Sequence, residues 1–242
     1  MSEILELAAI IDSAHRDRRL LDATAQGPLD LSTAYAVQRE LTALRMSRGA
    51  TRIGFKLGYT SEAMREQMHV DKPNHGPLLD TMRITDGCVP ATLIHPRVEP
   101  EVALVLGADL RPVEARAALE VVDSIWRDYR FTLELNTADG SSAAGLVLGP
   151  PLALAALDTL GVRLMCNGDI VAEGTGAAAM GHPVRALEWL RRELAVDGVA
   201  LRPGDVVITG GLTAAIPMGH GDVVTAEFGD GGPTVRLHNP GV

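Results

Sequence analysis

Two glutamates separated by one residue are the side chains of this sequence best suited to bind a metal ion. Glu99 and Glu101 lie in segment 95–107, whose valines and leucines predict a β-strand. Side chains alternate across a strand, so both carboxylates face the same side. Such a pair is unfavourable to bury without a cation. Oxygen ligands at this spacing suit Mg²⁺ or Mn²⁺ better than zinc, but a solvated strand face carrying two acids would give the same pattern.

A proline between the two glutamates constrains their strand. Pro100 has no backbone N–H to donate, so this part of the strand is expected at a sheet edge or at an irregularity. Both carboxylates would then face an open cavity rather than a packed sheet.

Lysine is rare in this chain, and one lysine lies in an apolar segment. Lys56 and Lys72 are the only lysines among 22 lysines and arginines. Glycine alternates with bulkier residues at 53–58, which predicts a strand that allows close backbone approach. An ammonium there can bind a substrate carboxylate, or transfer a proton if burial lowers its pKa. The structural alternative is a lysine at the end of a strand that reaches solvent.

Four further features could contribute to a site. Asp80 follows two leucines, and an acid in apolar surroundings can have a raised pKa. Glu120 precedes two valines, as an acid on a buried strand would. The small residues at 139–145, Ser142 among them, could hold an anion, although such loops often serve packing alone. His182 opens a helix, where it could contact an anion or simply cap the helix.

The elements that must position these residues change in character near residue 50. Periodic apolar residues predict two helices before it, and a mostly β pattern with one helix follows. Asn167-Gly168 predicts a hairpin, and 73–77 a turn. We therefore expect an α+β protein with an N-terminal helical region at 1–50. A β-rich catalytic domain at 51–242 would carry the metal site, and the two regions can also form one single domain.

Composition excludes several classes of partner. A net charge of −9 argues against nucleic acid and anionic membrane surfaces. The sequence has no apolar run long enough to cross a bilayer, and residues 1–19 lack the pattern of a secretory signal. Two cysteines, Cys88 and Cys166, are too few for a disulfide framework. We expect a cytoplasmic protein with no nucleic-acid or membrane partner, and its apolar β-rich half favours a homo-oligomer.

Several of these segments occur in the order found in the 2-keto-4-pentenoate hydratase / 4-oxalocrotonate decarboxylase family. This family belongs to the fumarylacetoacetate hydrolase-like superfamily. The resemblance runs from about residue 5 to the C-terminus, and the paired glutamates with a third glutamate downstream are its most specific part. The matching segments are 54–61, 76–80, 96–101, 119–124, 181–183 and 204–211.

The resemblance implies a fold and a metal site. The family fold is a mixed β-sheet roll preceded by N-terminal helices. Its acids that match Glu99, Glu101 and Glu120 bind Mg²⁺ or Mn²⁺. Two departures bear on this match. The connection from Gly107 to the third glutamate is shorter than the family's, where a full helix is expected. Gly140 stands where the family usually has Asn, which bears on substrate specificity.

The resemblance also implies roles for other side chains. Lys56 would contact the substrate carboxylate or enolate, Asp80 would move a proton, and Ser142 would orient the substrate. The further substrate contacts that the resemblance implies are Leu79, His182 and Thr209.

Two reactions fit the resemblance. Family substrates resemble 2-oxo-enoates and 2-hydroxydienoates from the meta-cleavage of aromatic rings, and a metal can chelate such a 2-oxo acid and stabilise a dienolate. Decarboxylation of a 4-oxalocrotonate-like 2-oxo-3-enedioate is favoured by segments 94–96, 174–178 and 209–215. Segment 143–149 is more like hydratases, which add water to 2-hydroxypenta-2,4-dienoate to give a 4-hydroxy-2-oxo acid.

A third hypothesis belongs to another class. Decarboxylases and hydratases of this family associate, so the chain could be a catalytically silent structural subunit of such a complex. The intact set of candidate acids argues against it, because a silent subunit has no chemical need for them. A complex with a paired hydratase or decarboxylase is compatible with either role.

Overall fold

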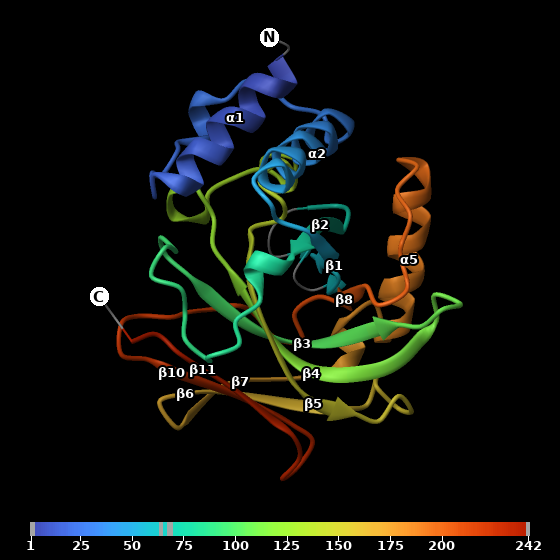
Figure 1. Cartoon of the computed structure of the whole chain (residues 1–242). Coiled ribbons are helices and arrows are strands. Elements are labelled where there is room, and N and C mark those ends of the chain that lie inside the picture. Colours follow the sequence, from blue (N-terminus) through green and yellow to red (C-terminus); the bar gives the residue numbers. More distant parts are fainter. Residues whose placement is uncertain (1–2, 63–64, 67–69, 241–242) are drawn as a thin grey trace.

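The computed structural model describes residues 3–62, 65–66 and 70–240 of the chain. Two helices, α1 (Glu3–Arg16) and α2 (Leu31–Ser47), come first and lie together at one end of the molecule (Figure 1). Asp30 begins α2 by accepting a hydrogen bond from the backbone N–H of Thr33. The predicted N-terminal helices are confirmed, and no described helix is long and apolar enough to span a bilayer.

Two sheets form the rest of the molecule. The larger sheet has seven strands in the order β2-β1-β8-β3-β4-β5, with β9 paired to β3. Among its described strands β1 and β8 pair in parallel and the other neighbours pair antiparallel, so the sheet is mixed and the expected α+β class is confirmed. Its strands are β1 (Arg52–Gly58), β2 (Asn74–Leu79), β3 (Arg97–Leu106), β4 (Pro112–Val122), β5 (Ala143–Leu152), β8 (Val206–Ile208) and β9 (Ile216–Pro217).

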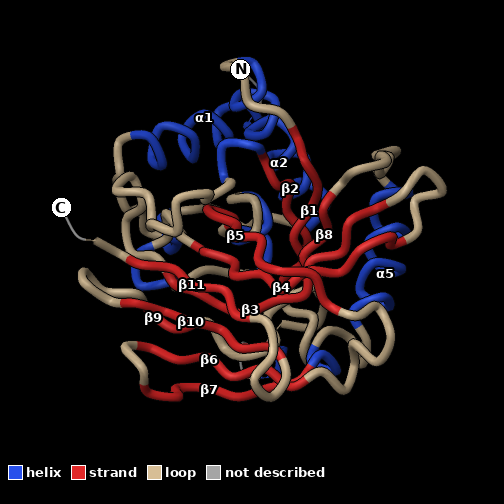
Figure 2. Tube along the Cα trace, turned by 60° about the horizontal axis from the view of Figure 1, so that its bottom comes forward, coloured by secondary structure: helices blue, strands red, loops and turns tan. Residues whose placement is uncertain are grey.

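The second sheet has four antiparallel strands in the order β11-β10-β6-β7, which run side by side in Figure 2. Asn167 and Gly168 join β6 to β7 with positive φ at both residues, so the predicted hairpin is confirmed. The strands are β6 (Gly161–Cys166), β7 (Asp169–Thr175), β10 (Val223–Phe228) and β11 (Thr234–His238). Two later helices are α4 (Leu133–Ala138) and α5 (Pro183–Val196).

The hydrophobic core has separate parts under the helices and between the sheets. A cluster around Trp126 and Leu41 is buried beneath α1 and α2, and a larger cluster joins both sheets to α5. Gln38 of α2 connects the helical region to the body, because its side-chain amide donates 2.8 Å bonds to the carbonyls of His75 and Thr137. The division of the chain at residue 50 stays a prediction.

The turn predicted at 73–77 is wrong, because these residues belong largely to β2. Gly76 pairs with Lys56, and Pro77 pairs with Phe55. A proline is tolerated because β2 is an edge strand and needs no donor on its outer side.

Pro100 lies at a gap beside β3. On one side of β3, β4 pairs along its whole length. On the other side, the pairing with β9 ends at Val98 of β3, and the pairing with β8 begins at Ala103 of β3. In the gap, the Pro100 carbonyl accepts a bond from the N–H of Leu212. Because no strand pairs with this side of β3 at Pro100, its missing backbone N–H costs no hydrogen bond between strands. The expectation that Pro100 marks an irregularity is therefore confirmed.

The β1–β8 pairing can be tested at a glycine. A Cβ on Gly54 would lie 1.8 Å from the carbonyl oxygen of Val206, so Gly54→Ala must push the two strands apart. We expect it to lower the free energy of unfolding by about 1–3 kcal/mol, measured by denaturant titration. Gly27→Ala is the matched control, because nothing lies within 4 Å of its Cβ position. Equal midpoints for both variants would contradict this pairing.

Candidate metal centre and active site

Three glutamates converge where β3 and β4 pair. The antiparallel register places Glu99 directly opposite Glu120, and Glu101 follows on the same face of β3. Ligand oxygens of all three carboxylates lie within 4.8 Å of one another. The short connection after Gly107 is a tight hairpin turn rather than a helix. Strand register therefore brings the third glutamate to the other two, so the short connection does not displace it.

The carboxylates lack enough hydrogen bonds for their burial. Glu101 and Glu120 are fully buried, and Oε1 of each has no hydrogen-bond partner among the described residues. Oε2 of Glu101 accepts a 2.7 Å bond from the N–H of Gly210. Burial, and next the charge of Glu120, raise the pKa of Glu99 to about 8 and that of Glu101 well above its ordinary value. A divalent cation would satisfy these oxygens and remove the repulsion, so the residues fit a metal.

Lys56 lies against this cluster as a buried ammonium. Its side chain is 4% exposed, and Nζ lies 3.1 Å from Oε2 of Glu120. Nζ also donates to the carbonyl oxygen of Ser141 at 3.0 Å and to its hydroxyl at 3.3 Å. Burial alone would lower the pKa of Lys56, but the charges of Glu120, Glu99 and Glu101 outweigh it and raise the pKa. The solvent-reaching alternative is wrong because the side chain is buried, and the raised pKa favours the charged form of Lys56.

A network of amides and hydroxyls fixes the loop beside Lys56. The hydroxyl of Ser141 donates to Asn74, whose amide donates to Asn136 at 2.9 Å. Asn136 in turn donates to the hydroxyl of Ser142 at 2.9 Å. Residues 140–142 all have positive φ, a conformation that stores backbone strain at the two serines. This network fixes the positions of Ser142 and of Ser141, which accepts hydrogen bonds from the Lys56 ammonium.

The departure at Gly140 has a backbone explanation. Its φ of +73° lies in the left-handed region, which glycine and asparagine both tolerate better than other residues. Across from it, Gly76 leaves room for the Gly140 carbonyl, which would lie 2.1 Å from a Cβ on Gly76. Glycine therefore preserves the loop conformation and removes only the side chain.

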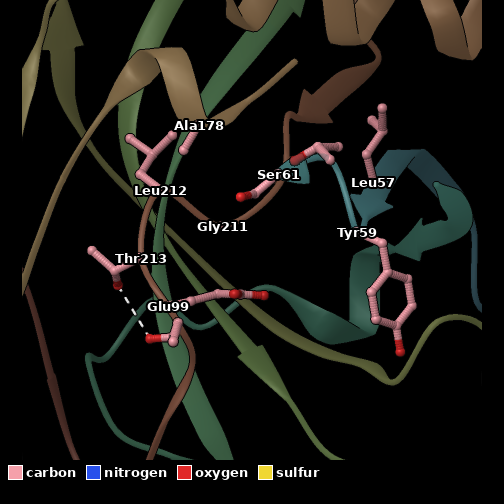
Figure 3. A pocket seen from close by; sticks show the side chains of 11 residues that line it. Leu57, Tyr59, Ser61, Glu99, Ala178, Gly211, Leu212 and Thr213 are labelled. Carbon is pink, nitrogen blue, oxygen red and sulfur yellow. Dashed lines mark hydrogen bonds between the residues drawn. The ribbon is translucent and has the colours of Figure 1, made fainter. Parts of the chain in front are cut away.

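Two cavities meet at Glu99. One, of about 220 Å³, is bordered by Lys56, Glu99 and Ser142. The other, of about 260 Å³, is drawn in Figure 3, where the Glu99 side chain reaches into it from β3. Gly211 is needed at this junction, because a Cβ there would lie 2.1 Å from Oε2 of Glu99. A ligand in the first cavity would contact the lysine, the serine and the Glu99 carboxylate together.

The structure adds side chains that sequence reasoning missed. Arg97, Tyr129, Asn136 and Ser141 also border the first cavity. Arg97 was within reach of the alternation rule, because it precedes Glu99 by two residues on the same strand. Tyr129 and Asn136 come from the segment between β4 and β5, which carries no motif that points to the site.

Asp80 lies outside both cavities. It begins a short 3₁₀ turn, and its carboxylate accepts 2.9 Å and 2.7 Å bonds from the N–H and hydroxyl of Thr51. These bonds lower the pKa of Asp80. The prediction of a raised pKa is therefore wrong, and the proposed role in proton transfer lacks support from this geometry.

Three other predicted substrate contacts also border neither cavity. Leu79 is in the apolar core. His182 caps α5, with Nδ1 accepting a 3.1 Å bond from the N–H of Val184, so its capping role is confirmed. The hydroxyl of Thr209 donates to the Val102 carbonyl at 3.1 Å. Their contacts with substrate stay predictions.

Comparison with known proteins shows which sequences this chain resembles. Residues 65–237 match the sequence model of the fumarylacetoacetate (FAA) hydrolase C-terminal family. The chain is 34% identical to a 4-oxalocrotonate decarboxylase of a Pseudomonas species, over 93% of each chain. It is 39% identical to a 2-keto-4-pentenoate hydratase of Burkholderia vietnamiensis, over 76% of each.

A solved structure extends this likeness to the whole fold. The structure is 4-oxalocrotonate decarboxylase from Pseudomonas putida, complexed with magnesium and adipate. It superposes with a TM-score of 0.91 at 30% identity, covering 98% of this chain and 97% of the other. A second structure of that enzyme, complexed with calcium and acetate, has a TM-score of 0.89.

The carboxylate cluster predicts an unusual pH dependence of stability. Folding raises the pKa of Glu99 from 4.5 to about 8, so in this window the folded, metal-free protein holds protons that the unfolded chain has released. Its free energy of unfolding should therefore fall as the pH rises from about 6.5 to 8, by up to about 1.4 kcal/mol per pH unit for each such proton. Thermal melts in EDTA across this range measure the effect. Below about pH 6.5 the buried His75, whose pKa burial lowers to about 4, acts in the opposite direction.

Added Mg²⁺ should raise the melting temperature more at pH 8 than at pH 5, because it replaces those protons. Glu101→Gln should weaken the Mg²⁺ effect, and Glu173→Gln, at an exposed ion pair on β7, should not. Equal Mg²⁺ effects at both pH values, or none, would contradict a metal site at this cluster.

Proposed function

Because the chain belongs to the fumarylacetoacetate hydrolase family, we propose that it is a divalent-metal-dependent lyase. Its substrate would be a 2-oxo-enoate or 2-hydroxydienoate of the aromatic meta-cleavage type. The reaction we favour is decarboxylation of a 4-oxalocrotonate-like 2-oxo-3-enedioate. One observation carries the proposal: a cluster of three glutamates lies against a buried lysine, and Glu99 and Lys56 both border one cavity. The likeness to a magnesium- and adipate-bound decarboxylase over nearly the whole chain supports it.

Mg²⁺ is the cation that we propose, with Mn²⁺ as the alternative. Glu99, Glu101 and Glu120 would hold it, and carboxylate oxygens are the ligands that both ions prefer. When bound, the cation would polarise the 2-oxo group of the substrate and stabilise negative charge that develops on its oxygen.

The chain's own residues would orient the substrate and balance its charge. Lys56 holds a positive charge beside the cluster, where it can attract a carboxylate or an enolate oxygen. The hydroxyl of Ser142 accepts its bond from Asn136, so its own hydrogen is available to a substrate oxygen. During decarboxylation the bond from C5 to the terminal carboxylate breaks. Its electron pair moves through the alkene to the 2-oxo oxygen, and CO₂ leaves.

Hydration is the second candidate. The 39% identity to a 2-keto-4-pentenoate hydratase favours it, and both reactions need the same stabilised enolate. The silent-subunit alternative is less compatible with a cluster whose burial is unfavourable without a cation. Cytoplasmic location, homo-oligomerisation and a complex with a paired enzyme remain part of this proposal.

Direct assay separates the two reactions. With Mg²⁺ and 2-oxohex-3-enedioate, we expect release of CO₂ that EDTA abolishes. With 2-hydroxypenta-2,4-dienoate, we expect little conversion to a 4-hydroxy-2-oxo acid. Loss of the ultraviolet absorbance of the diene measures this conversion. The reverse pattern would establish the hydratase, and turnover of neither substrate would favour the silent subunit.

Variants connect the activity to the site. Lys56→Met and Glu101→Gln should each lower kcat/KM by about a hundredfold or more, because each removes charge from the reacting centre. Arg111→Met, in the exposed β3–β4 turn, should retain full activity. Full activity of both site variants would contradict the assignment of the cavity.

A further inference from the structure

Arg97 extends the functional face of β3 beyond the metal cluster. It precedes Glu99 by two residues, so its side chain leaves the strand on the same face. Across the hairpin it pairs with Val122, just as Glu99 pairs with Glu120. Both members of the Arg97–Val122 pair border the same cavity as Lys56. The Arg97 backbone therefore lies about 7 Å along the strand from that of Glu99.

The guanidinium of Arg97 is held in place without a counter-charge. It lies 4.4 Å from the ring centroid of Tyr129. The Tyr129 hydroxyl is 3.0 Å from the carbonyl oxygens of both His95 and Val122, which fixes the ring. Within the described part of the chain, Arg97 forms no ion pair with an acid. A planar, preorganised cation of this kind suits a carboxylate ligand.

The rest of this cavity suits a carbon chain between two charged ends. The side chains of Val122, Phe131 and Ala215 border it with apolar atoms. Its charged lining residues are Glu99 and Lys56, which belong to the carboxylate cluster and its counter-ion, and Arg97.

We propose that Arg97 is a specificity-determining residue that binds the distal carboxylate of a dicarboxylic 2-oxo acid. The 2-oxo-carboxylate end of that molecule lies at the glutamate cluster, so this inference rests on the proposed function. A monocarboxylic 2-oxo acid of equal length leaves the guanidinium without its partner. The chain therefore discriminates by the second carboxylate.

Two ligands that differ only in that group provide the test. 2-Oxoadipate and 2-oxohexanoate have the same carbon chain, but only the first has a distal carboxylate. Isothermal titration of the Mg²⁺-loaded protein should give at least tenfold tighter binding of 2-oxoadipate. Arg97→Met should remove most of this preference and leave the Kd of 2-oxohexanoate within twofold. Arg97→Lys should keep part of the preference for 2-oxoadipate, and Arg111→Met should keep all of that preference.

The outcomes separate this inference from the proposed function. Equal affinities in the wild-type protein would overturn the inference, but would leave the 2-oxo acid site intact. If Arg97→Met lost affinity equally for 2-oxoadipate and 2-oxohexanoate, the inference would also be overturned, because Arg97 would then have a purely structural role. Binding of neither ligand to the wild-type protein with Mg²⁺ would overturn the proposed function as well.

Discussion

The structure depends on one electrostatic constraint: three carboxylates meet inside the protein on one face of a β-hairpin. The β3–β4 register brings Glu120 opposite Glu99, and Glu101 lies on the same side. Without a cation the cluster is relieved only in part, by the ammonium of Lys56 and the amide of Gly210. The elevated pKa values of Glu99 and Glu101 express the conflict that remains. Binding of a metal ion at this cluster would therefore be coupled to folding.

Close backbone approach allows the surrounding loops to reach the cluster. Gly210, at a positive φ of +101°, brings its N–H to Glu101 while leaving space for Thr60. Gly58 leaves room for Asn74 and Ser141, which hold the loop that contacts Lys56. Small residues on neighbouring strands thus let polar loops pack around a charged centre, which a larger side chain at any of these glycines would prevent.

Local sequence patterns predicted the parts of the site that one strand determines. Period-two alternation identified Glu99 and Glu101, and the same rule extends to Arg97. Placing Glu120 beside them also needed the family resemblance, because the hairpin register joins residues far apart in the chain. The strand at 74–79 was missed because its glycine and proline, with Pro73 just before it, indicate a turn, whereas pairing with β1 decides its conformation.

Asp80 shows the same limit in its chemistry. The leucines beside it predicted an apolar environment, but its hydrogen-bond partner Thr51, which immediately precedes β1, lowers its pKa. Partners that arrive from another strand cannot be read from neighbours in the chain. The α+β class and the N-terminal helices could be predicted, since they follow from periodicity and from family order.

Direct titration of the metal tests whether the three glutamates hold one divalent cation. Electron paramagnetic resonance of Mn²⁺ added to the metal-free protein should show one bound ion per chain. Glu120→Gln should bind Mn²⁺ at least tenfold more weakly, because it removes the ligand that the β3–β4 register places beside the other two glutamates. Absence of a stoichiometric Mn²⁺ site, or unchanged affinity in Glu120→Gln, would contradict a metal site at these glutamates.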